Sequence, residues 1–236
     1  MNGVVASIRA ELKANADEKT RDSTHRFFKE EVKTYGVKTP TVNKIAQNHW
    51  REVKKLDKTK IFVLCEELFS SDFMEEAFVV SDWLPNMVDQ FEPADLATFK
   101  VWIERYVNNW AKCDSFCNHT VGEFVEKFPQ CVKDIKAWAK SSNRWLKRAA
   151  AVSLILPARR GSFLTEVIEI STTLLCDQDD IVQKGYGWLL KEASRLHQKE
   201  VFDFVFKNQQ VMPRTALRYA IELMPKDLKA KAMKKD

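Results

Sequence analysis

One carboxylate, two indoles and one guanidinium are the side chains of this sequence whose types suit chemistry on a positively charged group. They are Asp114, Trp110, Trp188 and Arg148, carried on three separate segments. Trp110 precedes Asp114 by four residues, so on a helix the two share a face. A carboxylate and indole faces stabilise positive charge, and a guanidinium binds anions. If the fold brings them together, we expect a cationic, aromatic cleft around a single buried acid.

Helices must position these side chains, because the apolar residues recur with a helical period almost everywhere. Val5, Ile8 and Leu12 are spaced for one helix face, as are Phe62, Cys65, Leu68 and Phe69 for another. No run alternates at period two for long enough to form a strand. We therefore predict an all-α fold of helices about ten to eighteen residues long with short connections.

Prolines mark the expected helix boundaries. Thr39 and Pro40 are predicted as the cap and first residue of a helix, Pro93 and Pro129 as the starts of later helices, and Ser142 and Asn143 as residues preceding a helix that begins at Arg144. Further breaks are expected at Gly36, Pro85, Pro157 and Pro213.

Pairs of such helices recur roughly every forty residues, as in HEAT or armadillo repeats, although the sequence shows no clean self-similarity. We expect one domain over residues 1–236, built of HEAT-like helical repeats that form a curved α-solenoid. The concave surface of a solenoid carries a row of side chains that can follow an extended polymer.

Composition narrows the class of protein. The 236 residues are 45% apolar, enough for a substantial core, but no apolar run approaches the roughly 20 residues that cross a bilayer. We expect a soluble, cytoplasmic protein of a bacterial or archaeal type of cell, without a membrane partner or an obligate protein partner, acting as a monomer. The five cysteines lie in apolar segments and are interpreted as reduced packing residues.

Charge is distributed unevenly around a formal net charge of +5. Between residues 133 and 160 there are eight Lys or Arg residues and one acid, Asp134. This block is the expected anion-facing surface.

The sequence gives little support for a metal site, a phosphate-binding loop or a nucleophilic serine. Cys113, Cys117 and His119 lie close in sequence, but a thiol pair four residues apart suits a helix face better than a zinc site, so no metal is expected. The chain has only six glycines and neither a phosphate-binding glycine loop nor a nucleophile elbow. No cofactor is expected.

Four short motifs, in this order, give the chain a resemblance to the AlkD family of alkylpurine DNA glycosylases. They are Tyr35-Gly-Val-Lys-Thr-Pro40, Trp110-Ala-Lys-Cys-Asp114-Ser, Asn143-Arg-Trp-Leu-Lys-Arg148-Ala-Ala and Lys184-Gly-Tyr-Gly-Trp188-Leu-Leu-Lys191-Glu. The resemblance implies a HEAT-like stack that holds duplex DNA on its concave face. It also implies excision of cationic purines such as N3-methyladenine and N7-methylguanine without the base flipping that most base-directed enzymes use.

The resemblance also implies roles for individual residues. Asp114 would stabilise the oxocarbenium-like sugar and position or deprotonate the attacking water, with Trp110 and Trp188 beside it. Arg148 would contact the DNA backbone near the lesion. Lys191 stands where the family often has arginine, Phe27 where the pattern carries tyrosine, and Asp180-Ile181 where some relatives have aromatic residues. Further candidates for phosphate contacts are Lys38, Arg159, Arg160, Lys184, Arg195, Arg214 and Arg218.

Each assignment has a plainer alternative. The alternative for Asp114 is a helix cap, for the two tryptophans a place in the core, and for the charged run a solvated face. No lysine is obviously placed for Schiff-base chemistry, so a glycosylase of this kind would be monofunctional. The alternative to a glycosylase is a non-catalytic HEAT-repeat module that binds nucleic acid or protein.

Overall fold

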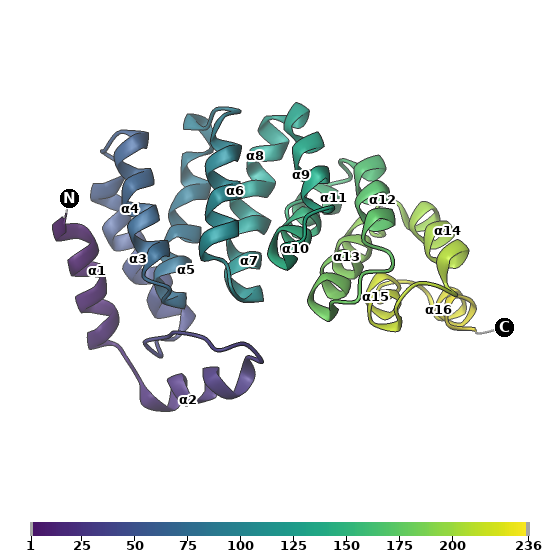
Figure 1. Cartoon of the computed structure of the whole chain (residues 1–236), viewed down its shortest axis with the longest axis horizontal. Coiled ribbons are helices and arrows are strands. Elements are labelled where there is room, and N and C mark those ends of the chain that lie inside the picture. The colour runs from purple at the N-terminus through teal and green to yellow at the C-terminus, as the bar shows by residue number, and fades with distance from the viewer. Residues whose placement is uncertain (1, 235–236) are drawn as a thin grey trace. The chain divides into compact units, whose positions relative to one another are not determined.

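Helices form every regular element of the protein between residues 2 and 234, the span that the computed structural model describes (Figure 1). Extended pairing in this span is limited to a single bridge between Lys33 and Phe73. The all-α prediction is therefore confirmed. The chain divides into two compact units, Met1–Phe116 and Cys117–Asp236.

The first unit is built around α5, which packs against α3, α4 and α7, while α1 packs against α3. One helix differs from the others: α2 contributes no buried side chain to the core. The elements of this unit are α1 (Asn2–Ala14), α2 (Glu18–Phe27), α3 (Thr39–Val53), α4 (Lys58–Ser70), α5 (Met74–Trp83), the 3₁₀ helix η1 (Leu84–Gln90), α6 (Asp95–Tyr106) and α7 (Trp110–Phe116).

The apolar stripes predicted from the sequence form the core of this unit. Val5, Ile8 and Leu12 of α1 are fully buried. Farther along, aromatic rings on α4, α6 and α7 pack together, with the Phe69 and Phe116 ring centroids 5.4 Å apart and edge-on. Burial of such apolar surface is the main source of stability for helices of this length.

A buried carboxylate on α5 holds the loop that joins α2 to α3. Glu75, only 2% exposed, accepts hydrogen bonds from the Thr34 hydroxyl at 2.6 Å and from the backbone nitrogens of Tyr35, Gly36 and Val37 at 3.1, 2.9 and 3.0 Å. Four donors compensate the loss of hydration that burial of a carboxylate entails. Glu75 therefore determines the course of the loop.

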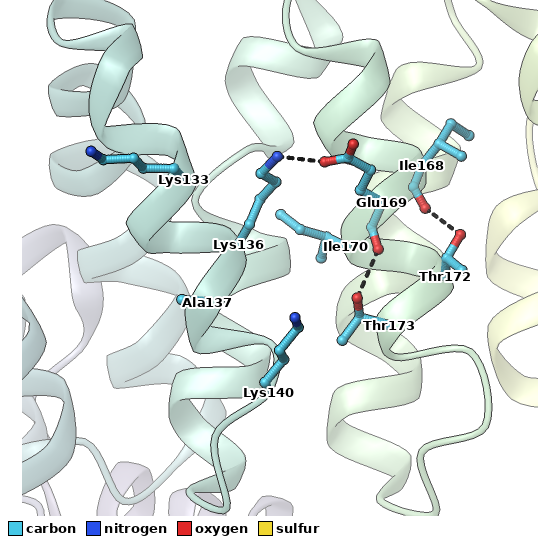
Figure 2. Close-up of a pocket in the computed structure, with 9 residues that line it drawn as sticks. All are labelled: Lys133, Lys136, Ala137, Lys140, Ile168, Glu169, Ile170, Thr172 and Thr173. Carbon is cyan, nitrogen blue, oxygen red and sulfur yellow. Dashed lines mark hydrogen bonds and ion pairs between the residues drawn. The ribbon is translucent and has the colours of Figure 1, made fainter.

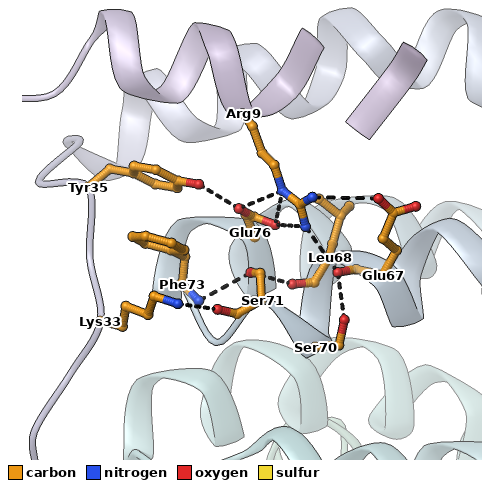
Figure 3. A network of polar contacts seen from close by, with 9 residues as sticks. All are labelled: Arg9, Lys33, Tyr35, Glu67, Leu68, Ser70, Ser71, Phe73 and Glu76. Carbon is orange, nitrogen blue, oxygen red and sulfur yellow. Dashed lines mark hydrogen bonds and ion pairs between the residues drawn. The ribbon is translucent and has the colours of Figure 1, made fainter. Parts of the chain in front are cut away.

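The next residue, Glu76, joins the same loop to α1 (Figure 3). Its fully buried carboxylate accepts two-pronged bonds from Arg9 at 3.0 and 3.1 Å and a bond from the Tyr35 hydroxyl at 2.7 Å. The Tyr35 ring stacks on Phe73 with centroids 3.9 Å apart. Burial and the bond to Glu76 raise the pKa of the Tyr35 phenol, so it stays a donor.

The second unit is built around α13, which packs against α10, α11, α12 and α15. Its elements are the π-helical turn η2 (Cys117–Val121), α8 (Gly122–Lys127), the 3₁₀ turn η3 (Pro129–Cys131), α9 (Val132–Trp138), α10 (Arg144–Val152), α11 (Ile155–Arg159), α12 (Leu164–Thr173), α13 (Asp180–Ala193), α14 (Gln198–Asn208), α15 (Arg214–Ala220) and α16 (Lys226–Met233).

The predicted start of α10 is confirmed. The Asn143 side chain accepts hydrogen bonds from the backbone nitrogens of Trp145 and Leu146 at 2.8 and 3.3 Å, which satisfies donors that the first turn leaves open.

Other boundary predictions are wrong. Lys38, not Thr39, is the N-cap of α3, and α6 begins at Asp95 instead of Pro93. Pro157 lies inside α11, in the first turn, where a missing backbone N–H leaves no bond unmade. The expected length also fails for α7, α8, α9, α11, α15 and α16, which have 7, 6, 7, 5, 7 and 8 residues.

We expect the substitution Gly36→Ala to destabilise the first unit by about 2 kcal/mol or more. Gly36 has a φ of +84°, and a Cβ there would lie 2.5 Å from the Asp17 carbonyl oxygen and 2.7 Å from the Arg21 Cβ. Chemical denaturation measures the change. The matched control is Gly3→Ala in α1, where nothing lies within 4 Å of an added Cβ. Equal stability of the two variants would contradict the assigned strain.

Candidate functional site

Asp114 and Trp110 both lie on α7, which begins at Trp110. The fully buried Asn109 precedes the helix, and its side-chain oxygen accepts a hydrogen bond from the Lys112 backbone nitrogen at 3.0 Å. Asn109 therefore makes the capping contact, and the alternative that Asp114 caps a helix is wrong. Asp114 lies in the second turn, half-buried and one turn beyond the half-buried Trp110.

Exposure separates the tryptophans assigned to the site from most of the others. Trp83, Trp102, Trp138 and Trp145 are at most 8% exposed, as expected for core residues. Trp110 and Trp188 are half-buried and keep part of their indole surface accessible. Trp50, which lies outside the assigned site, is also half-buried and contacts Trp83 with ring centroids 6.1 Å apart.

Two phenylalanines at the end of α2 meet the Trp110 indole. The Phe28 ring stacks on it with centroids 5.1 Å apart and planes 19° apart. The Phe27 ring, 69% exposed, meets the indole edge-on at 5.8 Å. A groove of about 320 Å³ opens beside these rings, lined by Ser23, Thr24, Phe27, Phe28, Thr39, Met74, Phe78, Trp110 and Ala111.

A buried lysine fastens α7 to the turn before α5. Lys112, 1% exposed, donates from Nζ to the Asp72 carboxylate at 2.5 Å and to the Asp72 carbonyl at 2.9 Å. The Asn108 amide also donates to the Asp72 carboxylate at 2.8 Å. Burial lowers the pKa of the Lys112 ammonium, and the bond to Asp72 opposes that shift. This pair holds the helix that carries Trp110 and Asp114.

In the second unit, Arg148 on α10 is 5% exposed and donates to the Ile181 carbonyl of α13 at 2.5 Å. Spacing along α10 would leave Arg148 near the edge opposite the buried stripe of Trp145 and Ala149, away from the core. That expectation is wrong, because α13 covers this edge and buries the arginine. Gly185 makes room for the arginine: a Cβ at position 185 would lie 3.4 Å from the Arg148 Cγ.

Trp188 lies on α13 in the same glycine-containing motif. A Cβ at Gly187 would lie 2.7 Å from the Tyr219 Cβ and 2.8 Å from the Ala216 carbonyl of α15, so this glycine permits close helix packing. Between the glycines, the buried Tyr186 donates to the Leu175 carbonyl at 2.9 Å. Packing on both sides thus sets the rotation of α13, and with it the position of Trp188.

Most of the other predicted DNA-binding cations already have partners within their own unit. The ion pairs are Arg159–Glu192 at 3.7 Å, Arg160–Glu123 at 2.9 Å, Lys184–Asp180 at 3.1 Å, Lys191–Glu222 at 3.3 Å and Arg195–Glu192 at 2.6 Å. Arg214 donates to the Met233 carbonyl, whereas Lys38 and Arg218 are exposed. Exposed ion pairs are worth little, so Arg160 and Lys184 can exchange a carboxylate for a phosphate. Arg159 and Arg195 share the buried Glu192 instead, and its carboxylate would lose its partners in such an exchange.

The basic block between residues 133 and 160 is distributed over several helices. Lys133, Lys136 and Lys140, along and just after α9, line a groove of about 480 Å³ against α12 (Figure 2). Lys136 spans it to Glu169 at 2.5 Å. On α10, Arg144 and Lys147 pair with Asp179 and Asp177 instead. The basic block is therefore not one continuous surface: its lysines on and after α9 line a groove, and its cations on α10 pair with aspartates.

The cysteines are buried except for one. Cys65, Cys113, Cys117 and Cys131 pack in the interior as predicted, but Cys176 is exposed, so its interpretation as a packing residue is wrong. No three His, Cys, Asp or Glu side chains within residues 2–234 are grouped as metal ligands would be. The helices of the described chain also include none long and apolar enough to pass through a bilayer.

The family model described as DNA alkylation repair enzyme matches residues 8–224, so the chain belongs to this family. Among solved structures it is similar to "Predicted DNA alkylation repair enzyme from Enterococcus faecalis". The TM-score is 0.80 at 17% identity, over 90% of this chain and 98% of the other. At that identity the likeness establishes a shared fold. No curated protein matches the chain.

Sequence reasoning missed Glu75, Glu76, Phe28 and the Lys112–Asp72 pair. The two glutamates had a detectable signal, since they are adjacent and lie between Met74 and an apolar run, Ala77-Phe-Val-Val80. Acids inside such a segment predict burial with compensating donors. The meeting of Trp110 and Asp114 with Trp188 and Arg148 stays a prediction.

We expect Lys112→Met to destabilise the first unit by about 1–3 kcal/mol, because the Asp72 carboxylate and carbonyl lose the buried ammonium that donates to them. The loss should grow as the pH rises towards 10.5. The folded state holds the lysine proton less tightly than the unfolded state, whose pKa is near 10.5, so deprotonation favours folding only where the lysine is present. Urea denaturation from pH 7 to 10 measures both effects. A difference that shrinks with pH would contradict the lowered pKa.

Proposed function

We propose that the chain is a DNA glycosylase that hydrolyses the N-glycosidic bond of cationic alkylated purines in duplex DNA. N3-methyladenine and N7-methylguanine are the type substrates. The observation that carries the proposal is the pair on α7: Asp114 and Trp110 are both half-buried and one turn apart, in a chain of the DNA alkylation repair enzyme family. A carboxylate and an indole on one side of a helix suit a developing positive charge.

The departing base needs no catalytic group from the protein. A purine alkylated at N3 or N7 carries a formal positive charge, so it leaves as a neutral base without a general acid. Cleavage moves that charge to the deoxyribose, which gains oxocarbenium character. We assign Asp114 to stabilise this sugar and to accept a proton from the water that attacks its anomeric carbon. Trp110 and Trp188 would act on the same sugar through their indole faces.

Contact with DNA is assigned to cations on both units and to one exposed ring. Phosphate contacts give a duplex-binding protein most of its affinity and its position on the DNA. Arg148 is the principal arginine of this group, although its buried guanidinium must share its donors between Ile181 and a phosphate. The remaining assignments are Phe27, Lys38, Arg159, Arg160, Lys184, Lys191, Arg195 and Arg214.

The same proposal covers the manner of action. The enzyme would leave the alkylated base in the helix stack, cleave only the glycosidic bond and act as a monomer in the cytoplasm, on chromosomal DNA. HEAT-like helical pairs would present a concave face to the duplex.

Asp114→Asn is expected to abolish release of N3-methyladenine and N7-methylguanine from methylated duplex DNA while DNA affinity stays within about twofold. Loss of the negative charge removes the stabilisation of the sugar without altering the phosphate contacts. Chromatography of released bases and a binding titration provide the two measurements.

The matched control is Asp203→Asn on α14, where the aspartate pairs with the exposed Lys199 at 2.7 Å. Undiminished release by the Asp114 variant would remove this residue from the chemistry. Absence of release by the wild type from any N3- or N7-alkylpurine would favour a non-catalytic binding module.

Arg148→Gln should weaken duplex binding and flatten the dependence of log affinity on log salt by about one unit, as expected for one lost phosphate contact. Fluorescence anisotropy over a salt series measures the slope. Lys199→Gln is the control, since its side chain is 84% exposed and lies outside the assigned contacts. An unchanged slope in the Arg148 variant would leave that arginine with a packing role alone.

A further inference from the structure

The Trp110 indole has two faces, and one of them is covered by a neighbour within its own unit. The Phe28 ring lies nearly parallel to it, with planes 19° apart and centroids separated by 5.1 Å. Phe27 instead meets Phe28 and Trp110 edge-on, at 85° and 68°. A cation–π contact needs the face of a ring, so a ring stacked on Trp110 limits where a positive group can approach.

The backbone gives Phe28 its orientation. It is the C-cap of α2, with extended angles of φ −85° and ψ 142°, and its N–H still donates to the Thr24 carbonyl at 3.2 Å. This change of direction turns Phe28 away from the regular course of the helix. Phe28 is half-buried, whereas the preceding Phe27 is 69% exposed.

Apart from these rings, α2 has no buried side chain that could hold it in place beside Trp110. No residue from Glu18 to Phe27 is buried, so the packing of this helix on α7 depends on the rings at its C-terminal end. Its N-terminal end is held through the backbone, where the Asp17 N–H donates to the Gly36 carbonyl at 3.1 Å. The loop that contains Gly36 is in turn held by Glu75, which accepts hydrogen bonds from the Gly36 and Val37 backbone nitrogens.

We propose that Phe28 is a positioning residue for Trp110: it fixes the plane of the indole and occupies one of its faces, so that the deoxyribose cannot approach that face. The role assigned to the indole in this step rests on the proposed glycosylase function. Phe28 itself makes no contact with the reacting atoms. Its effect is to hold a flexible side chain in one orientation before the substrate binds, which is the condition for charge stabilisation without reorganisation.

Phe28→Leu should lower the single-turnover rate of base release by about 3- to 10-fold, with affinity for undamaged duplex within about twofold. Phe28→Tyr keeps the ring and should restore the rate. The control is Phe206→Leu on α14, which removes a ring stacked on Phe202 at 5.6 Å and 23° and should leave the rate unchanged. A Phe28→Leu rate equal to that of the wild type would overturn the proposal.

A second measurement does not depend on activity. The indole N–H resonance of Trp110, identified by its loss in Trp110→Phe, should shift in Phe28→Leu and stay in place in Phe28→Tyr and Phe206→Leu. If the wild type releases no base, the glycosylase proposal fails, but this resonance still decides whether Phe28 orients the indole. If Phe28→Leu does not fold, nuclear Overhauser contacts between the Phe28 and Trp110 rings of the wild type decide it, and their absence would overturn the proposal.

Discussion

Two adjacent buried carboxylates, Glu75 and Glu76, are the constraint on which the site-bearing end of the first unit depends. Their charges are tolerable in the interior only because the loop between α2 and α3 and the guanidinium of Arg9 supply donors to them. The requirement acts in both directions. The carboxylates need the loop, and the loop, once held, places α2 so that Phe28 reaches Trp110.

The same logic of compensation operates at α7 and in the second unit. Lys112 is buried because Asp72 accepts from it, and Arg148 is buried because the Ile181 carbonyl accepts and Gly185 leaves space. In each case a charged side chain ties a site-bearing helix to its neighbour. Such ties restrict motion more than apolar packing does, because a displaced partner would leave a charge unpaired in a medium of low polarity.

Much of the fold was predictable because helical periodicity is a local property. The stripe of Val5, Ile8 and Leu12 is buried as the spacing required, and Asn143 caps α10 through contacts with its own neighbours in sequence. Predictions of helix boundaries failed where the local sequence is compatible with more than one boundary and tertiary packing decides between them. Proline in the first turn of a helix and proline between helices look alike in sequence, and the short helices around the π turn at Cys117 have no distinct pattern.

By itself, the sequence determined the helical class, the core stripes and the chemical types at positions 110, 114 and 188, because these follow from residue identity and spacing along one chain. Tertiary structure alone decided which charges are buried and which ring face of Trp110 is covered. The partners of Arg148, Lys112 and Trp110 lie on elements between 33 and 82 residues away. Spacing along a helix determines which neighbours in sequence share a face. It does not determine which distant side chain forms a hydrogen bond with a residue or stacks on it.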